Sequence, residues 1–519
     1  MKKNAYIILL LLGFSAWLGA CSKDDGPDEE VKKPKWEITT KEASAVDISK
    51  ATISGEVTSK GIGNIEKVYF SYWEQGNLAS LKKIDSELAE DGKTFSLALE
   101  ELKTLTTYAY KPVVKLESTL ELEGEILSFS TLVDENITEP VVKTMGVDKI
   151  SYQGGLMKGE LVSTGESNSV EYLFVVWEED KEEQNFAATL ADDGKTIEAM
   201  PTLNPNTTYN YKVVAINERF IGQGEVKQFT TGNRIYIDVN ADGKGDGTTW
   251  EDAFTEFTST ISKIKAPDLE IWMAEGTYYV TGHANLWQEN IRFYGGFESG
   301  AATLSDRDPK ANETVIDGRD IRGSGNDMIK TNRGSLENPT LFDGLIFQNG
   351  KGGDGVALSA DRPVVVKNCV FRENESRYGG AVIIFSTSAT FEDCLFTNNH
   401  ARGHSGAVLN VQGGGKRGDE MKILFERCKF AGNTANGRAG AVGNEKHGGA
   451  RAPYYSPIFR DCQFVNNKSN NGQGGALSNW SEIFPLYEGV KVWENEGGHC
   501  HANTDGACGG LIEEEIPVN

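Results

Sequence analysis

The chain has 519 residues, 58 of them glycine, and a formal net charge of -24 at pH 7. This negative charge argues against nucleic acid as a partner and against a surface held flat on anionic lipid. The composition agrees with an exported, soluble body, and the glycines concentrate in the C-terminal half, where tight turns are expected.

The N-terminal segment has the features of an export signal. Residues 1–3 (MKK) are basic, and residues 5–12 form an apolar run that is too short to span a membrane. The segment ends in LGAC at Cys21, which resembles the lipobox of bacterial lipoproteins. The resemblance implies a lipoprotein signal peptide over residues 1–20, cleavage before Cys21, and acyl chains that anchor Cys21 in a membrane. An ordinary secretory signal is the alternative.

Residues 21–35 are predicted to be an acidic linker. Ser22 after the lipidated cysteine resembles lipoproteins that are sorted to the outer membrane, and the acidic stretch 24–30 is similar to the export tag of surface-exposed lipoproteins in some Gram-negative bacteria. Lys23 interrupts that tag, and a solvated linker is the alternative. The resemblances imply a lipid anchor in the outer membrane and display at the cell surface.

Two copies of one all-β unit follow, at residues 36–132 and 139–232. AEDGKT at 89–94 reappears as ADDGKT at 191–196, an offset of 102 residues. Segments such as VYFSYW and EYLFVVW are rich in aromatic and β-branched residues and are bounded by Gly, Asn and Pro, which predicts short strands. A period of about 100 residues indicates two small sandwiches.

The ends of both units carry a resemblance. LNPNTTYNYKVVAINERFIGQGEVKQFTT closely resembles the end of a fibronectin type III domain, and LKTLTTYAYKPVVKLESTLELEGEILSFST is similar to it. The resemblance implies spacer or binding modules without catalysis.

Residues 234–345 lead into a repeat region. IYIDVNADGKGDGTTWEDAFTEFTSTISKI predicts a strand, a Gly/Asp turn and an amphipathic helix, and it resembles the N-terminal cap of a bacterial β-helix. Such a cap covers the strand edges and apolar side chains of an open end. Further on, FDGLIFQNG is interpreted as a degenerate first repeat with Phe347 at the repeated Phe position. The apolar positions of the expected helix are Trp250, Phe254, Phe257 and Ile261.

The last third of the chain repeats Cys-x-Phe-x-x-Asn followed by Gly-Ala, at separations of 25, 34 and 34 residues. A short unit with insertions of variable size is a solenoid signature. Cys and Phe are two residues apart, so they share one face of a strand, and coils about 4.8 Å apart would stack the rings and bond the Asn amides to one another. The ladder residues are Phe371, Phe396, Phe430 and Phe464, and Asn374, Asn399, Asn433 and Asn467.

Two further expectations concern the backbone of each repeat. The Asn is expected at a turn, since Asn tolerates a left-handed backbone. The Gly before Ala is expected to let neighbouring coils lie close together.

The repeats FRENESRYGGAV and FVNNKSNNGQGGAL resemble those of chlamydial polymorphic outer membrane proteins. The resemblance implies a right-handed parallel β-helix of the pectate-lyase-like kind over residues 234–519. The predicted fold class is therefore all-β, with two fibronectin type III-like sandwiches followed by a right-handed parallel β-helix with an N-terminal capping helix.

Of the seven cysteines, six remain once Cys21 is lipidated. The four repeat cysteines share one inward position with parallel Cβ vectors, so they are predicted to be buried thiols. A disulfide between Cys500 and Cys508 is predicted in an oxidising compartment. Zinc bound by these two cysteines with His499 and His501 is the alternative.

Asp238, Asn240 and Asp242 with Gly243 form the first half of a calcium loop, with oxygen ligands at alternate positions. Thr249 stands where such a loop ends in Glu, and a simple Asp/Gly turn is the alternative. No other metal or cofactor is predicted.

Basic and aromatic residues of the insertions are the candidates for ligand binding. Three arginines at like positions of consecutive coils would form a basic stripe suited to an acidic glycan, whereas solvated loop arginines are the alternative. The candidates are Arg377, Tyr378, Arg402, His404 and Arg438. Aromatic residues that could stack on sugars or belong to the core are Tyr378, Tyr454, Tyr455 and Trp480.

Together these features predict a cell-surface lipoprotein that displays a non-catalytic β-helix for glycan binding or adhesion. The alternative is a polysaccharide lyase or glycoside hydrolase of the β-helix class acting on an acidic glycan. No paired Asp motif stands out and no catalytic residue is assigned, so the enzyme question stays open. A purely structural spacer is a third option.

Overall fold

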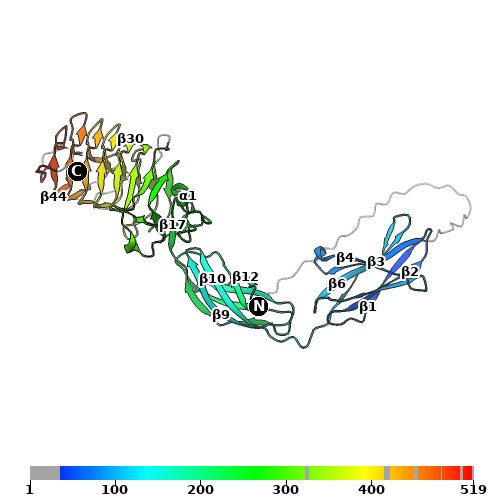
Figure 1. The fold of residues 1–519 in the computed structure, drawn as a ribbon. Helices are drawn as coiled ribbons and strands as arrows, with labels where there is room; N and C mark the ends of the chain where they lie inside the picture. Colours follow the sequence, from blue (N-terminus) through cyan, green and yellow to red (C-terminus); the bar gives the residue numbers. More distant parts are fainter. Residues whose placement is uncertain are drawn as a thin grey trace, which may run out of the picture. The chain divides into compact units, whose positions relative to one another are not determined.

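The computed structural model describes residues 35–321, 327–413, 421–448, 450, 454–480, 482–502 and 507–516. The expected signal peptide, Cys21 and nearly all of the expected acidic linker lie outside the described residues. The chain divides into two compact units, Met1–Ile137 and Thr138–Asn519. The described elements are mostly β-strands (Figure 1), which confirms the all-β prediction. Within these ranges, no helix is long and apolar enough to cross a membrane.

The first unit is an antiparallel β-sandwich. One sheet has the order β1-β2-β5, and the other has the order β4-β3-β6-β7 with β8 paired to β6. Apolar side chains from both sheets meet in one core, where the rings of Phe70 and Phe95 lie 5.2 Å apart. The strands are β1 Glu37–Ser44, β2 Ala51–Ser59, β3 Ile65–Glu74, β4 Lys82–Ser86, β5 Thr94–Leu99, β6 Thr107–Leu116, β7 Glu121–Glu123 and β8 Leu127–Ser130, with a 3-10 turn η1 at Leu78–Ser80.

The second unit begins with another antiparallel sandwich, whose strands follow the order β15-β14-β11-β12-β13-β10-β9 with β16 paired to β14. The repeated Asp-Gly-Lys-Thr motif is a turn in both sandwiches. Asp91 accepts the backbone N–H of Thr94 at 2.8 Å, and Asp193 accepts that of Thr196 at 2.8 Å. The strands are β9 Val141–Ser151, β10 Gly154–Ser163, β11 Glu171–Trp177, β12 Gln184–Leu190, β13 Thr196–Ala199, β14 Thr208–Ile216, β15 Ile221–Gln223 and β16 Lys227–Thr230.

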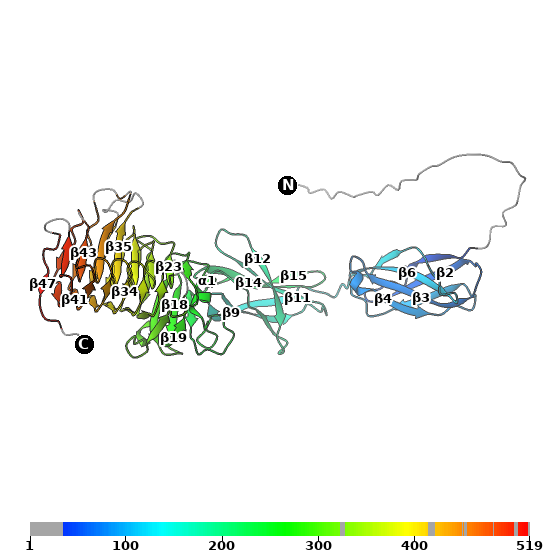
Figure 2. The same cartoon turned by 90° about the horizontal axis from the view of Figure 1, so that it is seen from above.

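From β17 onwards the chain winds into a parallel β-helix (Figures 1 and 2). Three long parallel sheets run along the stack, and a fourth sheet of two-residue strands follows one corner. The first sheet contains β17 Arg234–Ile237, β18 Glu270–Ala274, β21 Arg292–Phe297, β24 Thr340–Asp343, β28 Val364–Lys367, β32 Ala389–Glu392, β36 Ile423–Glu426, β40 Ile458–Arg460 and β44 Leu486–Glu488.

The other three sheets complete each coil. The second contains β19 Gly276–Tyr279, β22 Thr314–Asp317, β25 Leu345–Gln348, β29 Val370–Arg372, β33 Leu395–Thr397, β37 Lys429–Ala431, β41 Gln463–Val465, β45 Lys491–Trp493 and β47 Ile512–Glu513. The third contains β20 Ala284–Leu286, β23 Ile329–Thr331, β27 Leu358–Ala360, β31 Val382–Phe385, β35 Val408–Gln412, β39 Val442–Lys446, β43 Leu477–Asn479 and β46 Cys500–Ala502. The fourth contains β26 Lys351–Gly352, β30 Glu375–Ser376, β34 His400–Ala401, β38 Thr434–Ala435 and β42 Lys468–Ser469.

In-register pairing of the second sheet places like residues above one another. The repeated phenylalanines are fully buried and stack with nearly parallel rings, so each ring contacts the next coil. Successive ring centroids of Phe347, Phe371, Phe396, Phe430 and Phe464 are 5.2, 4.9, 4.7 and 4.6 Å apart.

The repeated asparagines form a buried amide ladder. The Nδ2 group of each Asn donates to Oδ1 of the next, at 3.0, 3.0, 2.9 and 2.9 Å along the series. The same Oδ1 atoms also accept the backbone N–H of the preceding Asn. The ladder therefore satisfies polar groups that would be costly to bury alone. Its members are Asn374, Asn399, Asn433, Asn467 and Asn495.

The turn beside this ladder differs from the expectation. The left-handed residue is the one before each ladder Asn, and the Asn itself does not have a positive φ. The Asn side chain forms the hydrogen bonds of the ladder, and the residue before it adopts the left-handed backbone of the turn. The left-handed residues are Glu373, Asn398, Gly432 and Asn466, with φ of 56°, 53°, 67° and 54°.

The glycine of each Gly-Ala step is required by close packing between coils. A Cβ atom on Gly380 would overlap the carbonyl oxygen of Gly406, and one on Gly406 would overlap that of Gly440. Each glycine thus lets the backbones of consecutive coils approach, as expected.

One α-helix is found among the described residues, α1 (Phe257–Lys263), which lies between β17 and β18 and buries Phe257 and Ile261 over the first coils. The helix is shorter than predicted. Phe254 lies before it in extended backbone and pairs with Ile237 of β17. Trp250 packs instead in a separate cluster with Trp272. For Phe254, pairing with β17 outweighs the helical spacing because it satisfies backbone groups at the edge of the first sheet. A 3-10 turn, η2 (Leu304–Asp306), follows β21.

Candidate functional site

The candidate ligand residues lie where the fourth sheet meets the third. Arg377 and Arg402 directly follow β30 and β34, which pair in register, so these two arginines occupy matching positions. Asn436 follows β38 at the equivalent position of the next coil. Arg438 lies two residues further along, so the three arginines do not form one stripe. The loops that hold Arg402 and Arg438 have the same length, and the arginine stands two positions later in ANGRAG than in ARGHSG.

A second line of residues runs along the same corner. The rings of Tyr378 and His404 stack with centroids 5.9 Å apart. The His404 ring accepts the backbone N–H of Arg438 at 3.2 Å, and the Arg438 guanidinium lies 4.7 Å from the ring centroid of Trp480. We call Tyr378, His404, Arg438 and Trp480 the corner patch. Tyr378, His404 and Arg438 each lie four residues before a strand of the third sheet. Trp480 directly follows β43, at the other end of that sheet, and the Arg438 side chain reaches it. The patch therefore includes residues of four successive coils.

Two glycines provide the space for the rings of the corner patch. A Cβ atom on Gly403 would lie 2.7 Å from the ring of Tyr378, and one on Gly437 would overlap the ring of His404. Both loops therefore need glycine for the aromatic rings to lie against the backbone of the next coil.

The protonation of His404 follows from its contacts. Nδ1 accepts the Arg438 N–H, so we assign the proton of the neutral ring to Nε2. Burial lowers the pKa of His404, the nearby Arg438 lowers it further, and Glu445 opposes this change. The neutral imidazole is thus favoured at pH 7 and offers Nε2–H as a hydrogen-bond donor.

Glu445, on β39, contacts the corner patch through Arg438. Only 8% of Glu445 is exposed, and its carboxylate lies 3.8 Å from Nη2 of Arg438 and 3.7 Å from Nε2 of His447. The Arg438 guanidinium is therefore held between a carboxylate and the Trp480 ring. Sequence reasoning missed Glu445, although a Glu within the strand VGNEK departs from the apolar pattern of its neighbours.

A groove of about 590 Å³ adjoins the patch at Tyr378, and we call it the arginine groove. The Arg377 guanidinium lies 4.9 Å from the Tyr378 ring centroid. Arg402 lies 3.7 Å from the carboxylate of Glu375. The groove is lined by Gly352, Gly353, Asp354, Arg377, Tyr378, Arg402 and Gly403.

Two of the other aromatic candidates lie apart from the corner patch. Tyr455 is 1% exposed, and its hydroxyl donates to the carbonyl of Asn410 at 2.8 Å, so it belongs to the core. Tyr454 is half-buried beneath Lys446, whose amine is 4.2 Å from the ring centroid.

The calcium candidates form a turn. Asp238 is buried, and its Oδ1 accepts the backbone N–H of Asn240 at 2.9 Å, while the N–H of Gly243 donates to the carbonyl of Glu251. Among the described residues, no group of three or more His, Cys, Asp or Glu side chains could hold a metal ion.

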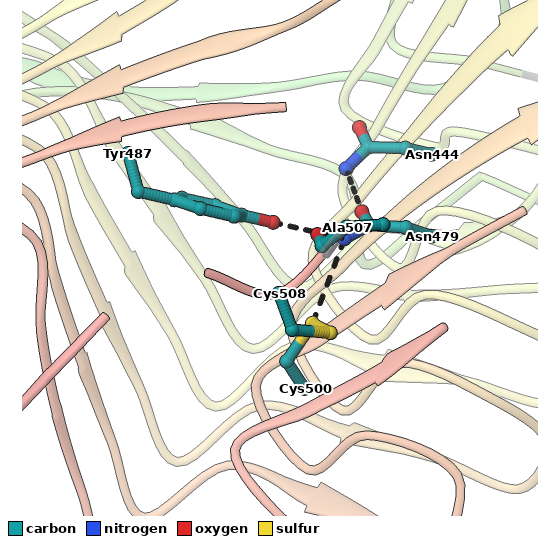
Figure 3. Close-up of a disulfide and its surroundings, with 6 residues drawn as sticks. All are labelled: Asn444, Asn479, Tyr487, Cys500, Ala507 and Cys508. Atoms are coloured by element: carbon teal, nitrogen blue, oxygen red, sulfur yellow. Dashed lines mark hydrogen bonds between the residues drawn. A yellow bond between two sulfur atoms is a disulfide. The ribbon is translucent and has the colours of Figure 1, made fainter. Parts of the chain in front are cut away.

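A disulfide joins Cys500 and Cys508 at the C-terminal end of the stack (Figure 3). An inner column of stacked asparagines ends beside the disulfide. In this column, Nδ2 of Asn444 donates to Oδ1 of Asn479 at 2.7 Å. Asn479 in turn donates to the Tyr487 hydroxyl at 3.0 Å and to the carbonyl of Ala507 at 2.7 Å. The sequence signal for this column is the Asn that ends each of the repeated segments GAVLN, GAVGN and GALSN.

The four repeat cysteines are buried free thiols. Their Sγ atoms contact backbone carbonyls, as between Cys369 and Phe342 at 3.7 Å. They therefore behave as small core side chains.

No protein-family model and no curated protein matches the chain. One similar solved structure is the sensor domain of the anti-sigma factor RsgI4 in Pseudobacteroides cellulosolvens, at 26% identity over 20% of this chain and 100% of that one, with a TM-score of 0.18. Another is a segment of two fibronectin type III domains from chicken tenascin, at 13% identity over 38% of this chain and 99% of that one, with a TM-score of 0.17. The chain consists of antiparallel β-sandwiches followed by a parallel β-helix with an asparagine ladder.

Proposed function

We propose that the chain is a lipid-anchored cell-surface protein whose β-helix binds glycan through the corner patch without cleaving it. The observation that carries the proposal is the series of contacts that joins Tyr378 to His404, His404 to Arg438 and Arg438 to Trp480. Partly exposed rings offer apolar faces, on which the C–H faces of sugars can stack, and the neighbouring donors suit sugar hydroxyls. Rigid coils hold these groups in place, so little conformational entropy is lost on binding.

The state of the His404 ring supports binding rather than catalysis. A general base needs a free lone pair beside the proton that it removes. The Nδ1 lone pair of His404 already accepts a backbone N–H, and the neutral ring has its proton on Nε2. His404 is therefore suited to donate a hydrogen bond to a ligand.

The proposed attachment to the outer membrane is supported by the lipobox-like LGAC ending at Cys21 and by the resemblance of the repeats to polymorphic outer membrane proteins. Its test is the mass of the N-terminal peptide from the membrane fraction of expressing cells. A peptide that begins at acylated Cys21 is expected, with loss of membrane association in Cys21→Ser. An unmodified N-terminus would remove the anchor from the proposal.

Glycan binding is tested by retention of the protein on a panel of immobilised acidic and neutral polysaccharides. The Trp480→Ala variant should lose at least tenfold in affinity for whichever polymer retains the wild type, about 1.4 kcal/mol. Trp287→Ala is the matched control, because Trp287 is 56% exposed and lies outside the patch. Equal retention of Trp480→Ala and the wild type would contradict the patch as the binding surface.

One observation favours an enzyme as the second candidate. The buried Glu445 carboxylate lies beside both Arg438 and His447, and a buried carboxylate next to an arginine and a histidine is a common catalytic arrangement. A lyase or hydrolase would release unsaturated or reducing ends from the same polymers, and Glu445→Gln would abolish that release. Any such cleavage overturns the non-catalytic proposal.

A further inference from the structure

We infer that the arginine groove binds the carboxylate of an acidic sugar, so that the glycan of the proposed function is a carboxylated one. The inference rests on the proposed glycan binding. It adds the chemical class of the ligand and the residue that recognises it.

The arginines of these coils differ in whether they have an acidic partner. Arg402 lies near Glu375, and Arg438 lies near Glu445. Other arginines of these coils have acidic neighbours as well, as Arg427 has in Asp393. Arg377 is exposed and has no ion pair among the residues that the structure describes. In a chain with 76 acidic and 52 basic residues, a groove arginine that forms no ion pair with the described residues is a ready site for an external anion.

The backbone around Arg377 is fixed on both sides. Its N–H donates to the carbonyl of Gly353 at 2.9 Å, and its own carbonyl accepts the N–H of Gly403 at 2.8 Å. The guanidinium also packs on the Tyr378 ring at 4.9 Å. A guanidinium held on an aromatic face keeps the donors at its edge available, and their fork geometry matches a carboxylate.

The rest of the groove suits a sugar ring. Asp354 supplies carboxylate acceptors for hydroxyl groups, while Gly352 and Gly353 leave backbone without side chains at the groove wall. Arg402 lies one coil further on, and its contact with Glu375 is a surface ion pair of the kind that contributes little, so a ligand can replace it. Tyr378 belongs to both the groove and the corner patch, so one oligosaccharide could occupy both.

The test compares two forms of one polymer. Polygalacturonate and its fully methyl-esterified form share one backbone, with a charged carboxylate in the first and a neutral methyl ester in the second. The affinity of the mature protein for each is measured by calorimetry. Polygalacturonate should bind at least tenfold more tightly than the ester. Arg377→Ala should remove that preference, Arg377→Lys should retain part of it, and the exposed Arg333→Ala outside the groove should retain all of it. Binding to polygalacturonate should also weaken as NaCl is raised.

Equal binding of the two forms, or an unchanged preference in Arg377→Ala, would overturn the inference. Polyglutamate that binds as tightly as polygalacturonate would overturn it too, because a peptide would then satisfy the groove. Retention of neutral polysaccharides through Trp480, with no preference for carboxylates, overturns this inference and leaves the proposed function standing. Failure to retain any polysaccharide removes both.

Discussion

Gly403 lies against the ring of Tyr378, so that a Cβ atom on Gly403 would come within 2.7 Å of ring carbon Cε1. The same Cβ would lie 2.8 Å from the carbonyl oxygen of Arg377. A side chain at position 403 must therefore displace the ring that forms one end of the corner patch.

The Gly403→Ala variant is expected to bind its glycan about tenfold more weakly and, because the added Cβ also meets a backbone oxygen, to lose about 1–3 kcal/mol of unfolding free energy. Polysaccharide retention and urea unfolding measure the two effects. Gly448→Ala is the control, because no heavy atom lies within 4 Å of a Cβ built there. Wild-type retention by Gly403→Ala would show that the position of the Tyr378 ring does not matter for binding.

Removing one ring of the buried ladder should destabilise the β-helix strongly. Phe430 is fully buried between two stacked rings at 4.7 and 4.6 Å, so Phe430→Ala leaves a cavity and should lower the free energy of unfolding by about 3–5 kcal/mol. Urea unfolding followed by tryptophan fluorescence measures the change. Phe385→Ala, at a side chain that is 39% exposed, should cost much less, and equal effects would argue against the ladder as the main source of stability.

Breaking the amide ladder should change amide hydrogen exchange close to the substituted residue. Oδ1 of Asn433 accepts both the backbone N–H and Nδ2 of Asn399, so Asn433→Ala leaves two buried donors without that acceptor, at about 1–3 kcal/mol each. Amide hydrogen exchange at Asn399 should accelerate. The exposed Asn436→Ala in the same loop should leave exchange at Asn399 unchanged, and no acceleration in Asn433→Ala would contradict the ladder's role.

The buried thiols predict a loss of stability at alkaline pH. Burial raises the pKa of Cys369 from 9.0 to about 12, so the folded state keeps the proton while the unfolded chain loses it. The stabilisation is fully present below pH 9 and falls by about 1.4 kcal/mol per pH unit between pH 9 and pH 12. Cys369→Ala removes this contribution, so the difference in unfolding free energy between wild type and variant should shrink by that amount above pH 9. A constant difference would contradict the prediction.

The disulfide between Cys500 and Cys508 should stabilise the C-terminal coil. It closes a short loop next to Asn479 and Ala507, and its loss should cost about 2–3 kcal/mol (Figure 3). Cys500→Ser with Cys508→Ser should therefore raise hydrogen exchange over residues 486–502. Reduction of the wild type should have the same effect, and it should have no further effect on the double variant. Exchange that is unaltered by either treatment would contradict a stabilising role.

Much of the β-helix could be predicted because its repeats place one residue type at one offset. The spacing of Phe371 and Asn374 from Cys369 sufficed for the predicted ladders. A second ring column was overlooked, although Phe also stands three residues before three of the repeat cysteines. The rings of Phe391 and Phe425 lie 5.0 Å apart, and Val366 takes that position in the first repeat.

The site was harder to predict because its side chains meet across neighbouring coils. Arg377 and Arg402 align, whereas Arg438 stands at the position of His404 in a loop of equal length. The contact between Arg438 and Glu445 joins residues whose approach is set by the path of the loop, which no periodic pattern encodes. The capping helix shows a similar limit, since backbone pairing of Phe254 with β17 outweighed its helical spacing.

Three consecutive coils each contribute one residue to the line of Tyr378, His404 and Arg438, at the position four residues before a strand of the third sheet. Duplication or loss of a whole coil would therefore lengthen or shorten this line by about 4.8 Å while the coils on either side keep their own contacts. Selection could in this way adjust the number of ligand units that the molecule accommodates, without redesigning any single subsite.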